Sequence, residues 1–316
     1  MEFIADLKEG QHVIEFYLCK EKQQLVTKAG KDYFKIMLED RSGSVIGMIW
    51  DLNMLVEPFS KGDIVKVDGR VQIYQDTKQI NIVRIRPAKE NEYDISNLFR
   101  TSRIPIETMY QKAMSMIERI QDPALKRLVL YFYKDNADIA RRLKRHPAAK
   151  NIHHGYIGGL LEHSVSVATL ALGYKEIYPN LDADLLIAGG LLHDIGKLKE
   201  LQMLPVSDYT DEGRLLGHIT IGYQMVYEQG CKIVELAPEK LTMLCHMILS
   251  HHGKLEYASP VVPATMEAMA LNMADLADSQ LKLMEDAIKG DNSEGHWTSF
   301  NRTLERYLYK PEENKA

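Results

Sequence analysis

The chain has 316 residues, of which 45% are hydrophobic and 26% are charged, a composition typical of a globular protein long enough for two domains. Its net charge of −5 excludes a polycation, so any contact with nucleic acid must come from a local basic patch or a bound metal. Three cysteines without disulfide or metal-site spacing favour a reducing compartment. There is no signal-peptide pattern, and no apolar run approaches the ~18 residues that span a bilayer, so we expect a cytoplasmic protein with no membrane partner.

Residues 1–90 have the pattern of short β-strands. Strand-forming or alternating segments occupy residues 13–18, 33–38, 45–50, 64–74 and 79–85, with turn residues at 41–44 and 61–63 and Pro87 after the last segment. A set of about five short strands with a break near residues 52–58 predicts a small closed barrel of the OB type.

Barrels of this type bind single-stranded nucleic acid by stacking bases on exposed aromatic rings beside basic groups. The alternation within residues 33–38 predicts that Tyr33 and Lys35 face outward. Trp50 and Tyr74 are further candidates for substrate contact, although the sequence does not fix their direction. The alternative is that these aromatic side chains pack in the core or at the rim and that the charges are solvated.

Residues 91–150 differ from the barrel. A polar stretch at 91–97 precedes helical patterns at 106–120 and from Asp122-Pro123 onward, where an aspartate cap and a proline in the first turn predict a helix start. The basic run 141–145 is either a solvated helix end or a contact for a phosphate backbone. The Met- and Tyr-rich helices of residues 106–133 suggest packing between subunits, from which we expect a homo-oligomer.

From residue 151 onward the pattern is helical. Apolar stretches follow the glycines at 155–159 and Gly217, and others lie at 184–192, 241–250 and 264–287. Gly196 is the expected stop of the helix that ends in His193-Asp194. We therefore predict a multidomain α and β chain with a β-barrel at 1–90, a helical linker region at 91–150 and an all-α helical bundle at 151–316.

Histidines are concentrated in this helical part. Eight of the eleven are His153, His154, His163, His193, His218, His246, His251 and His252. A lone histidine on an apolar helix is usually a satisfied core residue, but here several helices each supply one, and carboxylates accompany them. Imidazoles and carboxylates brought together from different helices are the ligands of transition-metal sites in helical bundles, and this set suits Mn, Fe, Co or Zn.

The combination of His163, His193-Asp194 and Asp275 resembles the signature of the HD-domain metal-dependent phosphohydrolases. The resemblance implies that these four residues hold one divalent metal ion and that Asp194 also faces a second ion. It further implies that the residues on the second ion are His218, His251 and His252. Some relatives hold a third ion through a carboxylate one turn before the first histidine, but Gly159 occupies that position here, so two ions are expected.

The wider pattern resembles the YhaM-type 3′→5′ exoribonucleases. It comprises residues 153–163, Leu216-Gly-His218 and residues 246–253, preceded by an OB-type barrel. The resemblance implies a 3′→5′ exonuclease that hydrolyses single-stranded RNA to nucleotides, with single-stranded DNA as a second expected substrate. Manganese is the metal we expect first, with iron or cobalt as alternatives.

Asp194 and Lys197 are the candidate catalytic residues. Two divalent ions that share Asp194 would lower the pKa of a water between them and offset the negative charge of a phosphodiester. Lys197 would neutralise a phosphate oxygen or assist the leaving group, although a solvated lysine at a helix end is the alternative. His153 and His154 are candidates for a phosphate contact or for protonation of the leaving oxygen, against a structural role.

Two further side chains lie close to the ligands in sequence. His246 would sit about 120–140° around its helix from His251 and His252, which disfavours it as a ligand of the same ion. Asp278, one turn after Asp275, is a candidate for orienting a ligand from behind.

Two other functions remain open at this point. A phosphohydrolase of a small nucleotide, such as a cyclic dinucleotide or an alarmone, would use the same metal site. A nucleic-acid-binding regulator with an idle metal site would rely on the barrel alone, but the presence of every core ligand argues against it.

Overall fold

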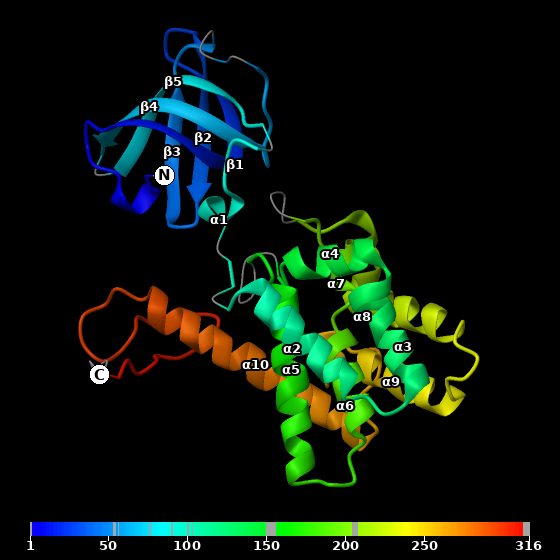
Figure 1. Ribbon diagram of the computed structural model, residues 1–316. Coiled ribbons are helices and arrows are strands. Elements are labelled where there is room, and N and C mark those ends of the chain that lie inside the picture. The colour runs from blue at the N-terminus through cyan, green and yellow to red at the C-terminus, as the bar shows by residue number, and fades with distance from the viewer. Residues whose placement is uncertain are drawn as a thin grey trace. The chain divides into compact units, whose positions relative to one another are not determined.

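The computed structural model describes residues 2–52, 55, 57–75, 77–89, 91–99, 101–102, 104–149, 156–203 and 208–311. The chain forms two compact units, of which the first ends at Thr101 and the second begins at Ser102. Figure 1 shows that the first is a β-barrel and the second is built from helices. This confirms the predicted fold class, a barrel followed by a helical bundle.

The barrel of the first unit is closed. Its strands are β1 (His12–Val26), β2 (Asp32–Asp40), β3 (Gly43–Ile49), β4 (Ile64–Tyr74) and β5 (Thr77–Pro87). They follow the order β1-β2-β3-β5-β4, β1 pairs with both β2 and β4, and β3 and β5 form the parallel pair. This five-stranded Greek-key arrangement is that of the OB-fold. A short 3₁₀ helix, η1 (Ile4–Asp6), precedes it and α1 (Ile95–Leu98) follows it.

The first strand is longer than its sequence pattern predicted. β1 continues beyond a bulge between Cys19 and Glu21 and then forms a long hairpin with β2. Its second half is largely exposed and polar, so it lacks the alternation that marks a half-buried strand. In β2 the predicted alternation is confirmed, because Ile36 and Leu38 are buried in the barrel core.

The second unit contains the remaining helices. They are α2 (Ile106–Glu118), α3 (Pro123–Leu130), the π-helical turn η3 (Tyr131–Asp135), α4 (Ala137–Arg145), α5 (Gly159–Gly173), η4 (Tyr174–Glu176), α6 (Ala183–Leu192), α7 (Lys197–Glu200), α8 (Asp211–Gly230), α9 (Pro238–Ser250), η5 (Leu255–Tyr257) and α10 (Met266–Gly290). Asp122 caps α3 through the amides of Ala124 and Leu125, with Pro123 at the first position, as predicted. Among the described residues, no helix is long and apolar enough to cross a membrane.

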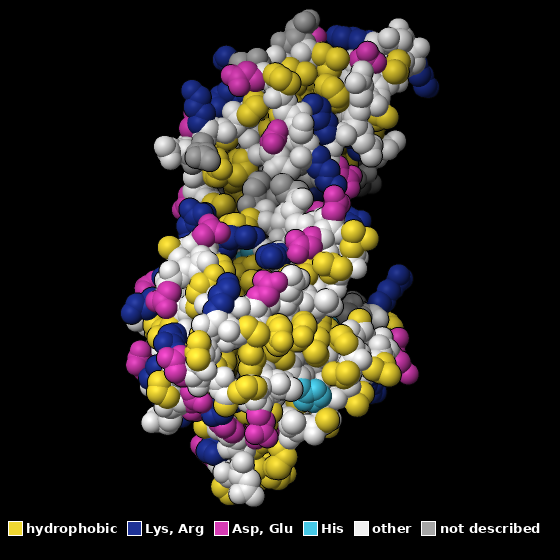
Figure 2. All heavy atoms as spheres, turned by 90° about the vertical axis from the view of Figure 1, so that its right-hand side faces the viewer, with side chains coloured by type: hydrophobic (Ala, Val, Ile, Leu, Met, Phe, Trp, Pro, Cys, Tyr) yellow, Lys and Arg dark blue, Asp and Glu magenta, His cyan; other side chains and the backbone are white. Residues whose placement is uncertain are grey.

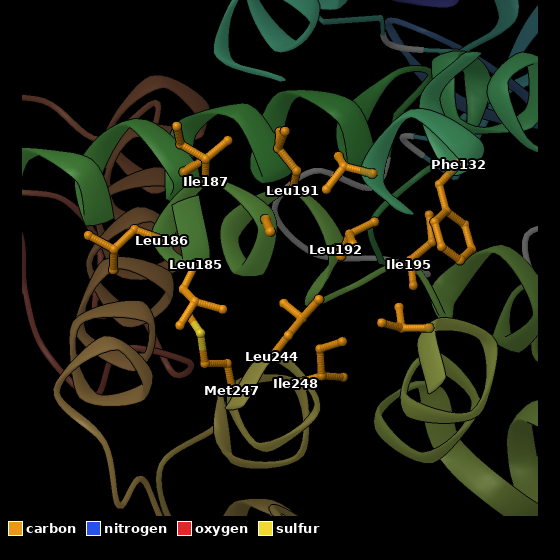
Figure 3. Close-up of a cluster of buried hydrophobic side chains, with 14 of the residues drawn as sticks. Phe132, Leu185, Leu186, Ile187, Leu191, Leu192, Ile195, Leu244, Met247 and Ile248 are labelled. Carbon is orange, nitrogen blue, oxygen red and sulfur yellow. The ribbon is translucent and has the colours of Figure 1, made fainter. Parts of the chain in front are cut away.

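Helix α6 is the centre of the helical core. Residues 184–192 are all buried, which is why this helix is apolar on every side. Figure 3 shows its side chains among those of α9, including Leu244, Met247 and Ile248. Gly190 allows α5 to approach closely, since a Cβ on Gly190 would lie 2.4 Å from the Cα of Ala168. Helices α5 and α6 are thereby held in direct contact, and each carries a metal-ligand candidate.

Residues 102–149 belong to this same unit rather than to a separate linker region. Met109, Met116 and Tyr133 are buried in the core that α5, α6, α9 and α10 share. The Tyr133 hydroxyl donates to the carbonyl of Leu191 at 2.9 Å. The division at residues 90 and 150 expected from the sequence therefore differs from the compact units. The Met- and Tyr-rich helices bury these side chains within their own chain, which removes the observation that suggested packing between subunits.

The basic run 141–145 is partly occupied by contacts within the chain. The guanidinium of Arg142 donates to the carbonyl of Leu198, and Lys144 pairs with Glu107 at 3.0 Å while lying over the ring of Tyr110. These contacts favour a structural role for both side chains.

Apolar side chains remain exposed on the helical unit, including Val234 and Leu215. Figure 2 shows such side chains gathered on one of its faces.

Candidate metal centre

Four predicted ligands meet where α5, α6 and α10 converge. His163 on α5 and His193 at the end of α6 have their Nε2 atoms 3.2 Å apart. Asp275 on α10 places Oδ1 3.2 Å from Nε2 of His163. Oδ2 of Asp194 lies 3.4 Å and 3.5 Å from the Nε2 atoms of His163 and His193. His163, His193 and Asp275 thus offer ligand atoms that lie within 4.8 Å of one another, as a single metal ion requires.

A second group of ligand candidates lies on the other side of Asp194. His218 on α8 and the pair His251 and His252 at the end of α9 also offer atoms within 4.8 Å of one another. Oδ1 of Asp194 lies 3.4 Å from Nε2 of His218 and 3.7 Å from Nε2 of His251. The two oxygens of Asp194 therefore face the two groups separately.

Three buried polar atoms at this junction lack the partners that such atoms normally have. Oδ1 of Asp194 and the Nε2 atoms of His218 and His251 have no hydrogen-bond partner among the residues that the structure describes. An unpaired buried polar atom costs free energy, and native proteins rarely keep one without a reason. Burial also lowers the pKa of His251 well below its usual value, so its imidazole is neutral and can act as a ligand. Imidazole nitrogens and carboxylate oxygens suit a divalent transition metal, and the residues present fit one.

Each histidine of the two candidate ligand groups has a contact at Nδ1, the ring nitrogen away from the centre. Backbone carbonyls of Gly190, Ile248 and Tyr257 hold His193, His251 and His252 at 2.9, 2.7 and 2.8 Å. These contacts direct the Nε2 atoms toward the centre and fix the tautomer that binds metal.

Carboxylates hold the other two ligand histidines. Oδ2 of Asp278 lies 2.7 Å from Nδ1 of His163, the orienting contact expected from its place one turn after Asp275. Burial alone would lower the pKa of His163, but hydrogen bonds to Asp275 and Asp278 outweigh it and raise the pKa to about 9. Glu200 on α7 lies 3.0 Å from Nδ1 of His218 and also accepts the His218 amide. Sequence reasoning missed Glu200, because nothing in the chain pattern pairs it with a histidine 18 positions later.

The backbone between α6 and α8 places His218. Gly196 does not stop α6, which ends at Leu192. It caps α7 and packs against the backbone of α8 at His218 and Gly222. Helix α8 begins at Asp211, earlier than predicted, and is kinked at Gly217, whose φ of 70° and ψ of 153° are open to glycine alone. The second part of α8 therefore starts at His218, close to where the sequence predicted a helix to open.

Lys197 lies beside the centre. Its Nζ is 2.7 Å from Oδ2 of Asp194, and its side chain is 18% exposed. Burial favours the neutral amine, but the neighbouring Asp194 more than offsets this and raises the pKa of Lys197, so the side chain is a cation. Lys197, Asp194, His163 and Asp275 together line a cavity of about 590 Å³. A phosphate group in this cavity would meet a fixed positive charge.

Three other histidines were singled out in the sequence. His153 and His154 lie outside the described residues. His246 has its Nε2 occupied by the amide of Ala264 at 2.9 Å, in agreement with the helical angle that disfavoured it as a ligand.

The candidates on the barrel lie at its surface. Tyr33 is half-buried and stacks on Trp50 with ring centroids 4.8 Å apart, while Lys35 is exposed on the same strand. Trp50 and Tyr74 are 43% and 61% exposed, and Tyr74 lies apart from the pair, at the turn between β4 and β5. The structure therefore brings Tyr33 and Trp50 together at the surface of the barrel.

Comparisons with known proteins agree with both halves of the chain. The family model of the HD domain matches residues 160–284, and the model of the OB-fold nucleic acid binding domain matches residues 20–88. A model described as a putative helicase matches residues 106–204. The chain is 36% identical over 96% of its length to the 3′-5′ exoribonuclease YhaM of Bacillus velezensis and 35% identical to that of Bacillus subtilis, and covers 96% of each. The chain belongs to the YhaM family.

In this YhaM-family chain the HD-domain match includes both groups of ligand candidates, from His163 to Asp275. The HD domain is a metal-dependent phosphohydrolase domain, so the centre is a site for divalent metal. The barrel was also compared with solved structures. One match is to the second OB-fold domain of replication protein A from Methanococcus maripaludis, with 20% identity and a TM-score of 0.22. The match covers 28% of this YhaM-family chain and 96% of the archaeal domain.

Proposed function

We propose that the protein is a 3′→5′ exoribonuclease that hydrolyses single-stranded RNA to nucleotides at a centre for two divalent ions. The observation that carries this proposal is the position of Asp194, whose two oxygens face two separate groups of histidines. Beside it, the buried Nε2 atoms of His218 and His251 have no hydrogen-bond partner among the described residues. The name 3′-5′ exoribonuclease YhaM, which both Bacillus relatives bear, supports the direction and the substrate.

The ligands of the two ions would divide at Asp194. His163, His193 and Asp275 would hold one ion, and His218, His251 and His252 the other, with Asp194 shared. Divalent ions held there supply Lewis-acid charge and lower the pKa of water. Manganese is the ion we expect first, with iron or cobalt as alternatives, because affinity within this ligand class depends on availability as well as on geometry.

The side chains of the protein supply the remaining functions. Lys197 presents a cation to the cavity and would offset the charge of a phosphate oxygen, a contribution that grows where water is excluded. Tyr33, Trp50, Lys35 and Tyr74 on the barrel would hold a single strand by stacking and charge. His153 and His154 remain proposed contacts of the substrate.

The test is hydrolysis of 5′-labelled single-stranded RNA with Mn²⁺ by the wild type, the Asp194→Ala variant and the control Asp211→Ala, which removes an exposed carboxylate from the same unit. We expect stepwise shortening from the 3′ end by the wild type and the control, and none by Asp194→Ala. Manganese content would fall in Asp194→Ala only. Equal shortening by all three proteins would contradict the assignment of the centre.

The two alternative functions are separated by the same preparations. Hydrolysis of a cyclic dinucleotide or an alarmone without cleavage of long RNA would indicate a small-nucleotide phosphohydrolase. Binding of RNA without hydrolysis, and without bound metal, would indicate a regulator. Single-stranded DNA in the same assay measures whether the 2′-hydroxyl is required.

Assembly and location complete the proposal. The exposed apolar side chains of the helical unit are the surface through which a homo-oligomer would form. Light scattering after size-exclusion chromatography measures the oligomeric state. A cytoplasmic location agrees with substrate availability and with three free cysteines.

A further inference from the structure

The cavity beside the metal centre has an apolar wall that the metal chemistry does not use. Besides ligands and Lys197, the cavity is lined by Met269, Met273 and Leu276 of α10 and by Tyr257 of η5. The three α10 residues recur at a spacing of four and three, so they form one stripe of the helix. They are 47%, 41% and 48% exposed, and Tyr257 is 58% exposed. Large apolar side chains are therefore open to an occupant of the cavity.

The polar side chains of this cavity are mostly engaged. Asn272 donates Nδ2 to the carbonyl of His251 at 2.7 Å, and Ser279 donates to Asp275 at 3.5 Å. Lys254 is exposed, lies 5.5 Å from the ring centroid of Tyr257 and forms no ion pair among the described residues. The described lining thus offers apolar surface, one aromatic ring and one additional cation, with little side-chain capacity to read the edge of a base.

The position of the wall restricts what can occupy it. The same cavity is lined by His163, Asp194 and Asp275, so an occupant of the wall is a group close to the reacting phosphate. The volume of about 590 Å³ lies within the range of pockets that hold small molecules. In a strand of nucleic acid, the flat group next to a phosphate is a base, and every base has a face that stacks on aromatic or apolar surface.

We propose that Met269, Met273, Leu276 and Tyr257 form a subsite for a nucleobase next to the scissile phosphate, which accepts all four bases, and that Lys254 contacts a phosphate of the same strand. The proposal rests on the proposed nuclease function. Because the subsite holds a base by its face, it contributes to affinity without selecting a sequence. The enzyme would therefore shorten RNA ends of any sequence at similar rates.

The first experiment uses the wild-type protein with Mn²⁺ and RNA oligonucleotides that end in A, C, G or U, together with one whose last two nucleotides lack bases. We expect KM values within about threefold of one another for the four natural ends, and a KM about 10-fold higher for the end without bases. An equal KM for the abasic end would overturn the subsite while leaving the nuclease intact. A difference of more than about 10-fold among the natural ends would overturn the acceptance of all four bases. No cleavage of any RNA would instead overturn the proposed function.

The second experiment tests whether the apolar side chains of α10 cause the difference in KM between natural and abasic ends. The double variant Met269→Ser and Met273→Ser should raise KM about 10-fold for all natural ends and leave KM for the abasic end unchanged. The matched control is Leu281→Ser, which alters a 63% exposed leucine on α10 that does not line this cavity. Manganese content should match the wild type in both proteins. An equal rise of KM on natural and abasic ends would show that the wall does not bind a base.

Discussion

Replacement of Gly196 by alanine is expected to disable the metal centre from outside the ligand set. A Cβ at this position would lie 2.0 Å from the carbonyl oxygen of His218 and 2.6 Å from the amide of Gly222. Ordinary contacts of a Cβ begin at 3.4 Å, so the His218 carbonyl must retreat by about 1.4 Å (3.4 − 2.0 Å). Both clashing atoms belong to the backbone of α8, so no side-chain rotation relieves them.

The magnitude follows from the tolerance of metal ligands. Distances to a metal hold within about ±0.2 Å, so a displacement of this size takes His218 out of its ligand position. We expect loss of metal from the group of His218, His251 and His252, and a fall in nuclease rate of at least ~100-fold. Overpacking costs about 1–3 kcal/mol, which for a unit of this size lowers Tm by roughly 2–12 °C.

The assay compares metal content, thermal unfolding and RNA shortening in Gly196→Ala and in Gly173→Ala. A Cβ at Gly173, at the end of α5, would meet nothing within 4 Å, so this control should match the wild type or gain up to ~1 kcal/mol from helix propensity. Wild-type metal content and Tm in Gly196→Ala would refute the reasoning, since the clash would then have been absorbed without moving His218.

Four further predictions concern single side chains and the metal itself. Lys197→Ala should lower kcat by about 100-fold or more, whereas Lys199→Ala, an exposed neighbour, should match the wild type in the same RNA assay. Tyr17→Phe should leave the stability of the barrel unchanged or raise it by up to ~1 kcal/mol in urea unfolding, because the buried Tyr17 hydroxyl has no partner among the described residues. Tyr133→Phe should cost the helical unit ~1 kcal/mol, because its hydroxyl bonds Leu191. A chelator should lower the Tm of the helical unit and leave the Tm of the barrel unchanged. For an ion present at 100 times its Kd, the loss of stability is ~3 kcal/mol. Equal shifts of both transitions in calorimetry would contradict the location of the metal.

The parts of the site that could be predicted from the sequence are those that depend on the type of a residue and on its immediate neighbours in the chain. His193-Asp194 and His251-His252 stand at the ends of apolar helices, and the resemblance to the HD signature added His163 and Asp275. The alternation in residues 33–38 likewise fixed the outward side of β2. In each case a short stretch of sequence is enough for the prediction, because the prediction does not depend on a residue far away in the chain.

The remaining features depend on contacts between segments, and these leave no local pattern. Glu200 is an ordinary helix-end acid until α8 brings His218 beside it. Gly196 reads as a helix stop, but its lack of a side chain is required by the backbone of another helix. The second half of β1 is polar on both faces, so it has no strand signal apart from its pairing with β2. The hairpin-like pairing of Trp297 with Tyr309 after α10 was also not predicted.

Helices α6 and α9 end in the same way, and this has a consequence for the affinity of the centre. The last carbonyls of a helix lack partners within it, and in both helices one of them accepts Nδ1 of the histidine that forms the C-cap: Gly190 for His193 and Ile248 for His251. The same contact therefore ends the helix and keeps the proton of the imidazole on Nδ1, which leaves Nε2 available to a metal ion. If either helix continued for another turn, its own amide would compete for that carbonyl, and the imidazole would be released to the wrong tautomer. The length of these two helices therefore acts as a determinant of metal affinity, as much as the ligand residues themselves.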